Sequence, residues 1–208
     1  MRINKLIGIF LLSSFVWMAN IAFVEAATSQ GNPVAMLQSI AKNMIQGLKA
    51  NKATLKTKPG IVYNLAYKYV VPYADLSEMS KRVLPPNIWN NATPSQRMQF
   101  QKEFTTLLIR TYASALTSYE DQTIEFYPVR GGYAGARTVV INSEISGSNI
   151  QPIRVSYRLL RVGSVWRLYD MSVEGVSLIQ SFRSQFASIL SQGSMDKLLG
   201  QMSRHNRR

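Results

Sequence analysis

Residues 166–186 read WRLYDMSVEGVSLIQSFRSQF, and this stretch combines two kinds of secondary-structure signal. Its first half has the composition of a β-strand, and its second half places apolar residues at helical spacing after Gly175. The stretch contains no Cys or His and only two carboxylates, Asp170 and Glu174. A strand that gives way directly to a helix, with so few reactive groups, favours a binding protein over an enzyme.

Three more strands are predicted before this stretch. The first ends in the turn-rich segment 131–135, and the later separators, 146–149 and 161–164, are short and contain glycine. Such separators favour antiparallel hairpins over crossover connections, so the sheet is predicted to be a meander. Apolar and polar or basic side chains alternate in the third strand, which predicts one apolar face and one solvent-exposed face. The four strands are expected at about residues 123–129, 136–145, 150–160 and 165–173.

The first half of the chain reads as helical, and two helices are predicted after the sheet. Apolar residues recur at helical spacing in each segment, and several segments begin with a capping residue. The clearest start is Thr93-Pro94-Ser95-Gln96, a capping box with proline at the first helical position. The helices are expected from Asn32-Pro33, at about 59–70, at about 75–83 before Pro85-Pro86, from Thr93, after Ser177, and at about 194–202.

This order of elements predicts an α+β fold, in which a curved antiparallel sheet of four or more strands packs over helices. The helical part is expected at about residues 32–119, the sheet at about 122–174 and the C-terminal helices at about 176–203. The length suits a single domain, taken as residues 27–208.

The first 26 residues have the layout of a secretory signal peptide. Arg2 and Lys5 precede a long apolar run, and small residues follow at Ala26 and Ala27. The run is long enough to raise a rival interpretation, an uncleaved membrane anchor, but no basic stop-transfer cluster follows it. We therefore expect residues 1–26 to be cleaved and the product to be exported.

The chain is strongly basic, with 24 Lys and Arg against 11 Asp and Glu and a formal net charge of +13. Such an excess attracts anionic partners, whether nucleic acid, an anionic lipid surface or an acidic protein. Export argues against nucleic acid, and no nucleic-acid-binding motif is present. We therefore expect no nucleic-acid partner.

Catalytic motifs are absent from the sequence. It has no phosphate-cradling or dinucleotide-binding glycine motif, no Cys, and one His near its end. Nucleophile-histidine pairs and soft-metal sites are thereby excluded. Asp170 and Glu174 lie four apart on one strand, and either an acid-base pair or ordinary ion pairs with nearby Arg would explain them. We predict no enzyme activity and no catalytic residue.

The apolar stripes have two interpretations, a filled core or the lining of a ligand cavity, and composition favours the core. A resemblance changes the balance. The segment 166–177 resembles the W-x-x-Y-D-x-x-x-E-G-V-S signature of the MlaC family, also called toluene-tolerance auxiliary proteins. Val71-Pro72-Tyr73 and the segment 92–97, ATPSQR, resemble two further family segments. The order and spacing of these pieces also fit, and together they span nearly all of the chain after the leader.

The resemblance implies a periplasmic phospholipid carrier of Gram-negative bacteria that helps to maintain outer-membrane lipid asymmetry. Its implied partners are phospholipid, an inner-membrane ABC transporter complex with an MlaD-like component, and an outer-membrane MlaA-like lipoprotein. Its implied fold joins helices to a sheet like the cone of nuclear transport factor 2, with acyl chains between sheet and helices. No cofactor is expected, because the lipid is cargo.

From this resemblance we expect the acyl chains to lie against the apolar face of the sheet and the facing helices. The lining residues predicted for such a pocket are Tyr73, Leu76, Met79, Phe104, Leu108, Tyr112, Val139, Ile141, Val155, Tyr157, Val173, Val176, Ile179 and Phe182.

Two other function classes stay open at this point. A small enzyme on the same cone-like fold would need a polar group deep in the pocket, such as Asp170 buried beside a cavity with its acidity strongly shifted. A structural protein of the cell envelope would have a filled core and no ligand. The turn from Glu174 to Ser177 is also open to two interpretations: it either aims the following helix by backbone geometry, or gates the pocket and contacts the lipid headgroup.

Overall fold

The computed structural model describes residues 31–191 and 193–207, apart from the side chains of Ser114 and Ala115. The predicted leader, residues 1–26, lies outside the described residues. Across the described part of the chain, no helix is both long enough and apolar enough to cross a membrane.

The second half of the chain forms one antiparallel sheet in which neighbouring strands follow the chain order. The sheet is open, because its first and last strands do not pair with each other. The predicted meander is therefore confirmed, with one strand more than the four identified in the sequence. The strands are β1 (Thr123–Phe126), β2 (Thr138–Gly147), β3 (Ile150–Val162), β4 (Val165–Val173) and β5 (Val176–Ser177).

Helices precede and follow the sheet, as predicted. Those before it are α2 (Pro33–Ala50), α3 (Gly60–Tyr69), α4 (Leu76–Val83), α5 (Pro86–Asn91) and α6 (Pro94–Thr117), with single-turn 3-10 helices η1 (Lys52–Thr54) and η2 (Val71–Tyr73). Those after it are α7 (Leu178–Leu190) and α8 (Met195–Asn206).

The helix starts follow from the capping residues in the sequence. The Asn32 side chain accepts hydrogen bonds from the backbone N–H groups of Val34 (3.0 Å) and Ala35 (3.2 Å). The predicted capping box is reciprocal: Thr93 Oγ1 accepts from Gln96 N (3.2 Å), and Gln96 Oε1 accepts from Thr93 N (2.9 Å). These bonds satisfy donors that the first turn of a helix otherwise leaves unpaired.

Some boundaries differ from the prediction. Pro85-Pro86 ends α4 as expected, but Pro86 then occupies the start of α5, a short helix that the sequence interpretation missed. Proline suits a first helical turn because the missing N–H has no partner there in any case. Strand β1 ends at Phe126 rather than 129, β2 begins at Thr138 rather than 136, and α8 continues to Asn206 rather than 202.

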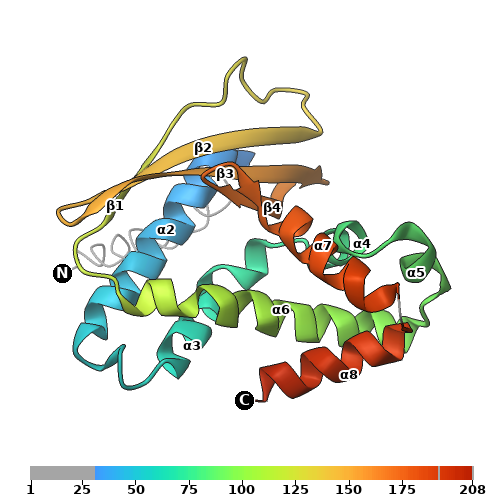
Figure 1. Cartoon of the computed structure of the whole chain (residues 1–208). Coiled ribbons are helices and arrows are strands. Elements are labelled where there is room, and N and C mark those ends of the chain that lie inside the picture. Colours follow the sequence, from blue (N-terminus) through green and yellow to red (C-terminus); the bar gives the residue numbers. More distant parts are fainter. Residues whose placement is uncertain (1–30, 192, 208) are drawn as a thin grey trace, which may run out of the picture.

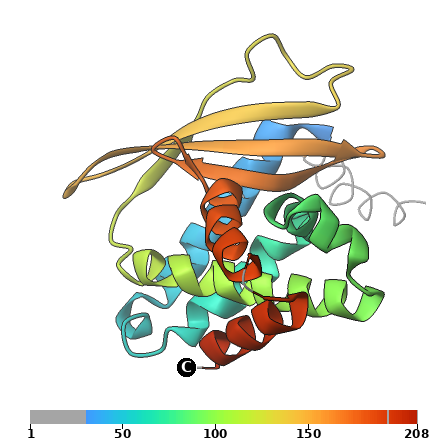
Figure 2. The same ribbon diagram turned by 45° about the vertical axis from the view of Figure 1, so that its right-hand side comes forward.

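The sheet and the helices form separate layers (Figures 1 and 2). Helix α2 runs along one face of the sheet, and α7 descends from the end of the sheet to the layer that contains α3, α6 and α8. Direct contacts between the layers are made by α2, α4, α7 and η2.

The buried side chains form three clusters. The helical cluster consists of Met79, Val83, Leu84, Trp89, Phe100, Phe104, Ile179, Phe182, Phe186, Leu190, Met195, Leu198, Leu199 and Met202. The sheet cluster consists of Met36, Leu37, Ile40, Val139, Ile141, Leu159 and Trp166. A third cluster, Leu48, Leu55, Val62, Ala113 and Tyr119, lies among α2, α3 and α6.

Candidate functional site

The inner face of the sheet, which packs against α2, is apolar along its central strands. Val139 and Ile141 of β2 pair with Leu159 and Tyr157 of β3, and these side chains lie against α2 in or beside the sheet cluster. Val155 continues the same face and is only 3% exposed, yet it belongs to none of the three clusters that the described residues form. The predicted alternation of β3 is confirmed by this burial.

Strand β4 changes register opposite the junction of Arg158 and Leu159, where Arg158 pairs with Asp170 and Leu159 pairs with Leu168. Tyr169 is the extra residue of this β-bulge. Tyr169 packs against the helical cluster, whereas Leu168 packs against the sheet cluster. The bulge therefore lets one strand contribute to two hydrophobic clusters.

The helical cluster has an aromatic centre. Phe100 and Phe104 stack with ring centroids 5.6 Å apart, and Phe104 contacts Phe182 and Phe186 edge-on at 5.4 and 5.9 Å. Aromatic pairs in these geometries add about 0.5–1.5 kcal/mol each beyond the burial of their surface. This part of the molecule is a closely packed core.

The structure divides the predicted lining residues between the two layers. Val176 is the outlier, because it is 61% exposed in β5. The helical cluster contains Met79, Phe104, Ile179 and Phe182, and Leu76 and Leu108 pack against it. The sheet cluster contains Val139 and Ile141, and Tyr73 and Tyr157 pack against it. Outside the clusters lie the buried Val155 and the half-buried Tyr112 and Val173.

A polar pair interrupts the apolar face of the sheet. The Ser143 hydroxyl is buried and donates a hydrogen bond to the Tyr157 oxygen at 3.3 Å. Burial raises the pKa of Tyr157, while the hydrogen bond from Ser143 acts in the opposite direction. Phe126 lies beside the Tyr157 ring, with centroids 5.6 Å apart. Burial also raises the pKa of Tyr112, on α6.

The turn between β4 and β5 is a two-residue hairpin. Glu174 and Gly175 have φ angles of 48° and 81°, as in a type I′ turn. Ser177 then caps α7 by accepting a hydrogen bond from Gln180 N at 3.2 Å. The structural interpretation of this motif is confirmed: Gly175 supplies a left-handed backbone and Ser177 starts the helix.

Asp170 fastens this turn to α7. Its side chain is 5% exposed in the folded chain and accepts hydrogen bonds from the Ser177 hydroxyl (2.8 Å), Ile179 N (3.2 Å) and Met171 N (2.8 Å). A carboxylate near the N-terminus of a helix is also favoured by the helix dipole. Because both oxygens of Asp170 are engaged in these structural bonds, the acid-base interpretation loses its principal residue.

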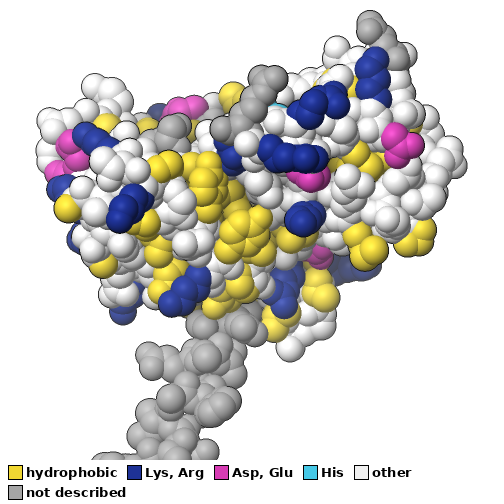
Figure 3. All heavy atoms as spheres, turned by 90° about the horizontal axis from the view of Figure 1, so that it is seen from below, with side chains coloured by type: hydrophobic (Ala, Val, Ile, Leu, Met, Phe, Trp, Pro, Cys, Tyr) yellow, Lys and Arg dark blue, Asp and Glu magenta, His cyan; other side chains and the backbone are white. Residues whose placement is uncertain are grey.

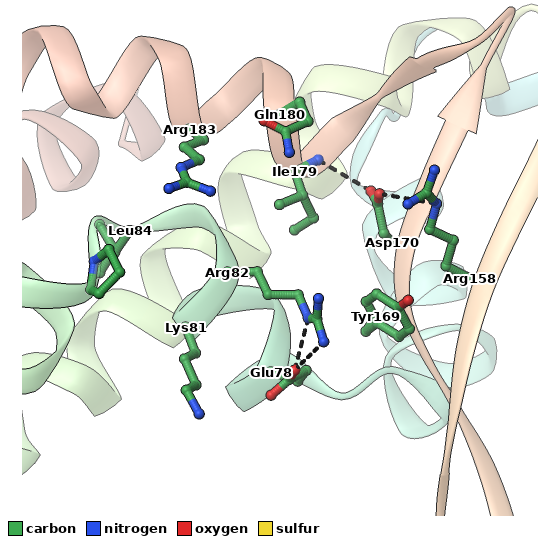
Figure 4. Close-up of a pocket in the computed structure, with 11 residues that line it drawn as sticks. Glu78, Lys81, Arg82, Leu84, Arg158, Tyr169, Asp170, Ile179, Gln180 and Arg183 are labelled. Carbon is green, nitrogen blue, oxygen red and sulfur yellow. Dashed lines mark hydrogen bonds and ion pairs between the residues drawn. The ribbon is translucent and has the colours of Figure 1, made fainter. Parts of the chain in front are cut away.

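A pocket of about 390 Å³ opens between α4, α7 and the β3-β4 pair (Figure 4). We call it the basic pocket, because four cations line it beside two carboxylates. These are Lys81, Arg82, Arg158 and Arg183, with Glu78 and Asp170. The sequence interpretation missed it, because its cations come from three elements that are distant in the sequence, and none belongs to a motif.

Two of the four cations in the basic pocket have partners within the chain. Arg82 binds Glu78 at 2.6 Å and lies over the Tyr169 ring, 4.4 Å from its centroid. Arg158 Nε lies 3.9 Å from Asp170 Oδ2. A second pocket, about 350 Å³, lies between α2 and β1, with Lys42 and Lys49 at its margin.

The face of the helical layer that points away from the sheet carries a band of hydrophobic side chains with Lys and Arg around it (Figure 3). Tyr67 of α3 is one of the exposed aromatic residues, and its hydroxyl lies 3.2 Å from Thr106 Oγ1 of α6. Basic side chains are more frequent than acidic ones on this face, in keeping with the net charge.

Within residues 31–191 and 193–207, no group of three or more His, Cys, Asp or Glu side chains could hold a metal ion. An open antiparallel sheet with one apolar face, set over a helical layer with an aromatic core, defines an α+β protein. The chain belongs to the MlaC family, whose model, described as MlaC protein, matches residues 38–204. The resemblance found in the sequence is thereby confirmed, and the chain is a non-enzymatic lipid-binding protein.

Two curated relatives cover most of the chain. It is 26% identical to the toluene tolerance protein ttg2D of Pseudomonas putida over 175 residues, which are 84% of this chain and 80% of the relative. It is 24% identical to the intermembrane phospholipid transport system binding protein MlaC of Haemophilus influenzae over 199 residues, 93% of this chain and 90% of the relative.

A solved structure has the same fold. It is the phospholipid-binding protein of Ralstonia solanacearum in complex with a phospholipid. The two structures superpose with a TM-score of 0.77 at 28% sequence identity, covering 84% of this chain and 96% of the other.

Proposed function

We propose that this chain is a periplasmic phospholipid carrier that moves lipid between the two membranes of the cell envelope. The observation that carries the proposal is the match in fold to a protein solved with a bound phospholipid. The match covers 84% of this chain and 96% of that protein. Membership of the MlaC family and the relative named as an intermembrane phospholipid transport binding protein support the same function.

The acyl chains are proposed to lie against the part of the inner sheet face at the margin of the sheet cluster. Val155 and Tyr157 of β3 and Val173 of β4 form this part, and Tyr112 of α6 and Tyr73 of η2 are the proposed helical contacts. In this proposal Phe104 and Phe182 act as the packed floor beneath the lipid, since their rings are fully used in contacts with each other and with Phe186.

The energetic reason for such a pocket is the cost of exposing acyl chains to water. At about 0.8 kcal/mol per methylene, two chains in water would cost more than about 20 kcal/mol. An apolar protein surface that replaces the bilayer makes transfer close to isoenergetic. Direction must then come from a partner, because the sequence contains no nucleotide-binding glycine loop.

The proposed partners are an MlaD-like component of an inner-membrane ABC transporter and an MlaA-like outer-membrane lipoprotein. The word intermembrane in the name of the Haemophilus influenzae relative supports a pair of membrane partners. The net charge of +13 suits docking on acidic protein surfaces or on anionic membranes. Export through the N-terminal leader would place the chain between these partners.

Native mass spectrometry of the protein purified from its host, followed by lipid extraction, tests this function. We expect one phospholipid per chain, and uptake of lipid from vesicles after delipidation. A protein that carries no lipid and takes none up would be a structural envelope protein, and the proposal would be abandoned.

A further inference from the structure

The basic pocket holds more positive charge than its own carboxylates balance. Glu78 is engaged by Arg82, and Asp170 is engaged by Ser177, by two backbone N–H groups and, at longer range, by Arg158. Lys81 and Arg183 make no hydrogen bond or ion pair with any side chain in the part of the chain that the structure describes. Two unbalanced cations therefore border one hollow.

The geometry of the pocket suits a tetrahedral anion. Arg82, Arg158 and Arg183 approach the hollow from α4, β3 and α7, so an occupant would meet guanidinium groups on three sides (Figure 4). Guanidinium groups offer pairs of N–H donors in a plane that matches phosphate oxygens. Gln180, in the first turn of α7, adds a neutral amide to the same wall.

The pocket is also built on rigid supports. Stacking on the Tyr169 ring and pairing with Glu78 fix Arg82, while the hydrogen bonds of Asp170 fix the start of α7. Ile179 forms part of the pocket wall and belongs to the helical cluster. Preorganised cations lose less conformational entropy on binding an anion than flexible surface lysines do.

The basic pocket and the proposed lipid site lie on opposite faces of the same two strands, so a lipid that occupied both would pass around the edge of β4, which pairs with β5 only at Ser172 and Val173. Tyr157 and Met171 pair on the inner face, and the next pair, Arg158 with Asp170, faces the pocket. We propose that the basic pocket binds a phosphate group, either in the headgroup of the carried phospholipid or as a free anion. The headgroup alternative rests on the proposed function, whereas the free-anion alternative does not.

The test uses two soluble probes, inorganic phosphate and sn-glycero-3-phosphoglycerol, which has the headgroup phosphodiester but no acyl chains. Each probe is titrated at low salt into the delipidated protein, and binding is followed by amide NMR shifts of α4 and α7. We expect the double variant Lys81→Gln/Arg183→Gln to bind at least about tenfold more weakly, because charge-assisted hydrogen bonds are lost. The matched control Lys42→Gln/Lys49→Gln removes two cations beside the other pocket and should bind as the parent protein does.

Repeating the titration with lipid-loaded protein distinguishes the two sources of phosphate. If the pocket holds the headgroup, loaded protein binds the phosphodiester at least about tenfold more weakly than delipidated protein does, since one phosphate excludes another. If the natural ligand is a free anion, loaded and delipidated proteins bind inorganic phosphate equally. Equal binding by the pocket variant and the parent, or no binding of either probe, overturns the proposal.

Failure of this proposal is separable from failure of the carrier function. Lipid extracted from the same preparations reports on the carrier function alone. If the parent protein contains one phospholipid per chain while neither probe binds, only the pocket proposal falls. If the protein contains no lipid and takes none up, the carrier function falls whatever the probes do.

Discussion

The helical cluster and the inner face of the sheet are both apolar, but they are packed differently. Four phenylalanines fill the centre of the helical cluster, with ring centroids 5.4–5.9 Å apart. The inner face of the sheet instead carries half-buried aromatic residues and a buried hydroxyl pair, Ser143 and Tyr157. A surface with hydroxyl groups and half-buried aromatic rings suits a changing occupant, whereas the aromatic cluster suits a permanent structural role.

Helix α6 contains both kinds of surface on one stripe. Phe104, Leu108 and Tyr112 are spaced four residues apart and so share a helix face. Phe104 is 1% exposed, Leu108 is half-buried against the helical cluster, and Tyr112 is half-buried outside the three clusters. The comparison between core and ligand surface can therefore be tested within a single helix.

The largest expected effect is on stability, from Phe104→Ala. Removing this ring from the aromatic centre should lower the free energy of unfolding by about 3–5 kcal/mol, through lost transfer energy and a cavity. Tyr112→Ala, two turns along the same stripe, should cost about 1 kcal/mol. Urea unfolding of the delipidated proteins measures both. Equal losses for the two variants would mean that Tyr112 is as much a core residue as Phe104.

The next effect is on lipid content, from Val155→Trp. The larger side chain should occupy space that an acyl chain needs and reduce bound lipid by about tenfold or more, given that crowding costs about 1–3 kcal/mol. Val140→Trp is the matched control, because Val140 is 50% exposed on the other face of the neighbouring strand. Lipid extraction and native mass spectrometry provide the measurement. If the Val155 variant binds as much lipid as the parent protein, the acyl chains do not lie on this face.

A smaller loss is expected from Asp170→Asn. The asparagine amide keeps one acceptor oxygen but has an NH₂ group in place of the other oxygen. This NH₂ group would face the Ser177 hydroxyl or the Ile179 N–H, so two buried donors would point at each other. Stability should fall by about 1–3 kcal/mol. Glu125→Gln, at an exposed position on β1, should change stability little. If the Asp170 variant is as stable as the parent in urea, the junction between the β4-β5 turn and α7 does not depend on this carboxylate.

The smallest effect concerns pH and Tyr157. Burial raises the pKa of Tyr157 in the folded chain, so the unfolded chain loses this proton first as pH rises. Its contribution to stability is full below the ordinary tyrosine value of about 10 and is lost between that value and the raised pKa. Tyr157→Phe should therefore flatten the fall in stability above pH 10 by at most about 1.4 kcal/mol per pH unit. Identical urea-unfolding curves between pH 9 and 11 would contradict the burial.

The sequence predicted the order of elements, because caps and hydrophobic periods are local signals. Thr93, Ser177 and Gly175 each satisfy a backbone requirement that can be recognised without tertiary structure. Strand β5 was missed because its two residues carry no periodicity, and the β4 bulge was missed because it depends on the register with β3.

The candidate site was harder to predict than the fold. Phe104 and Tyr112 look alike in the sequence, since both lie on one apolar stripe, and only packing separates them. The basic pocket gave no signal, because Lys81, Arg158 and Arg183 converge through tertiary structure alone. The family resemblance supplied the kind of ligand, while the geometry supplies the proposed division between lipid surface and core.

Photo-crosslinking tests directly whether the acyl chains lie on the inner face of the sheet. A benzophenone side chain replaces Tyr157 in one protein and Tyr127, which points away from the inner face and is exposed, in another; both proteins are loaded with phospholipid and illuminated. We predict a covalent phospholipid adduct, identified by intact mass, at position 157 and none at position 127. A loaded protein that forms its adduct at 127 and not at 157 would show that the acyl chains do not lie on the inner face.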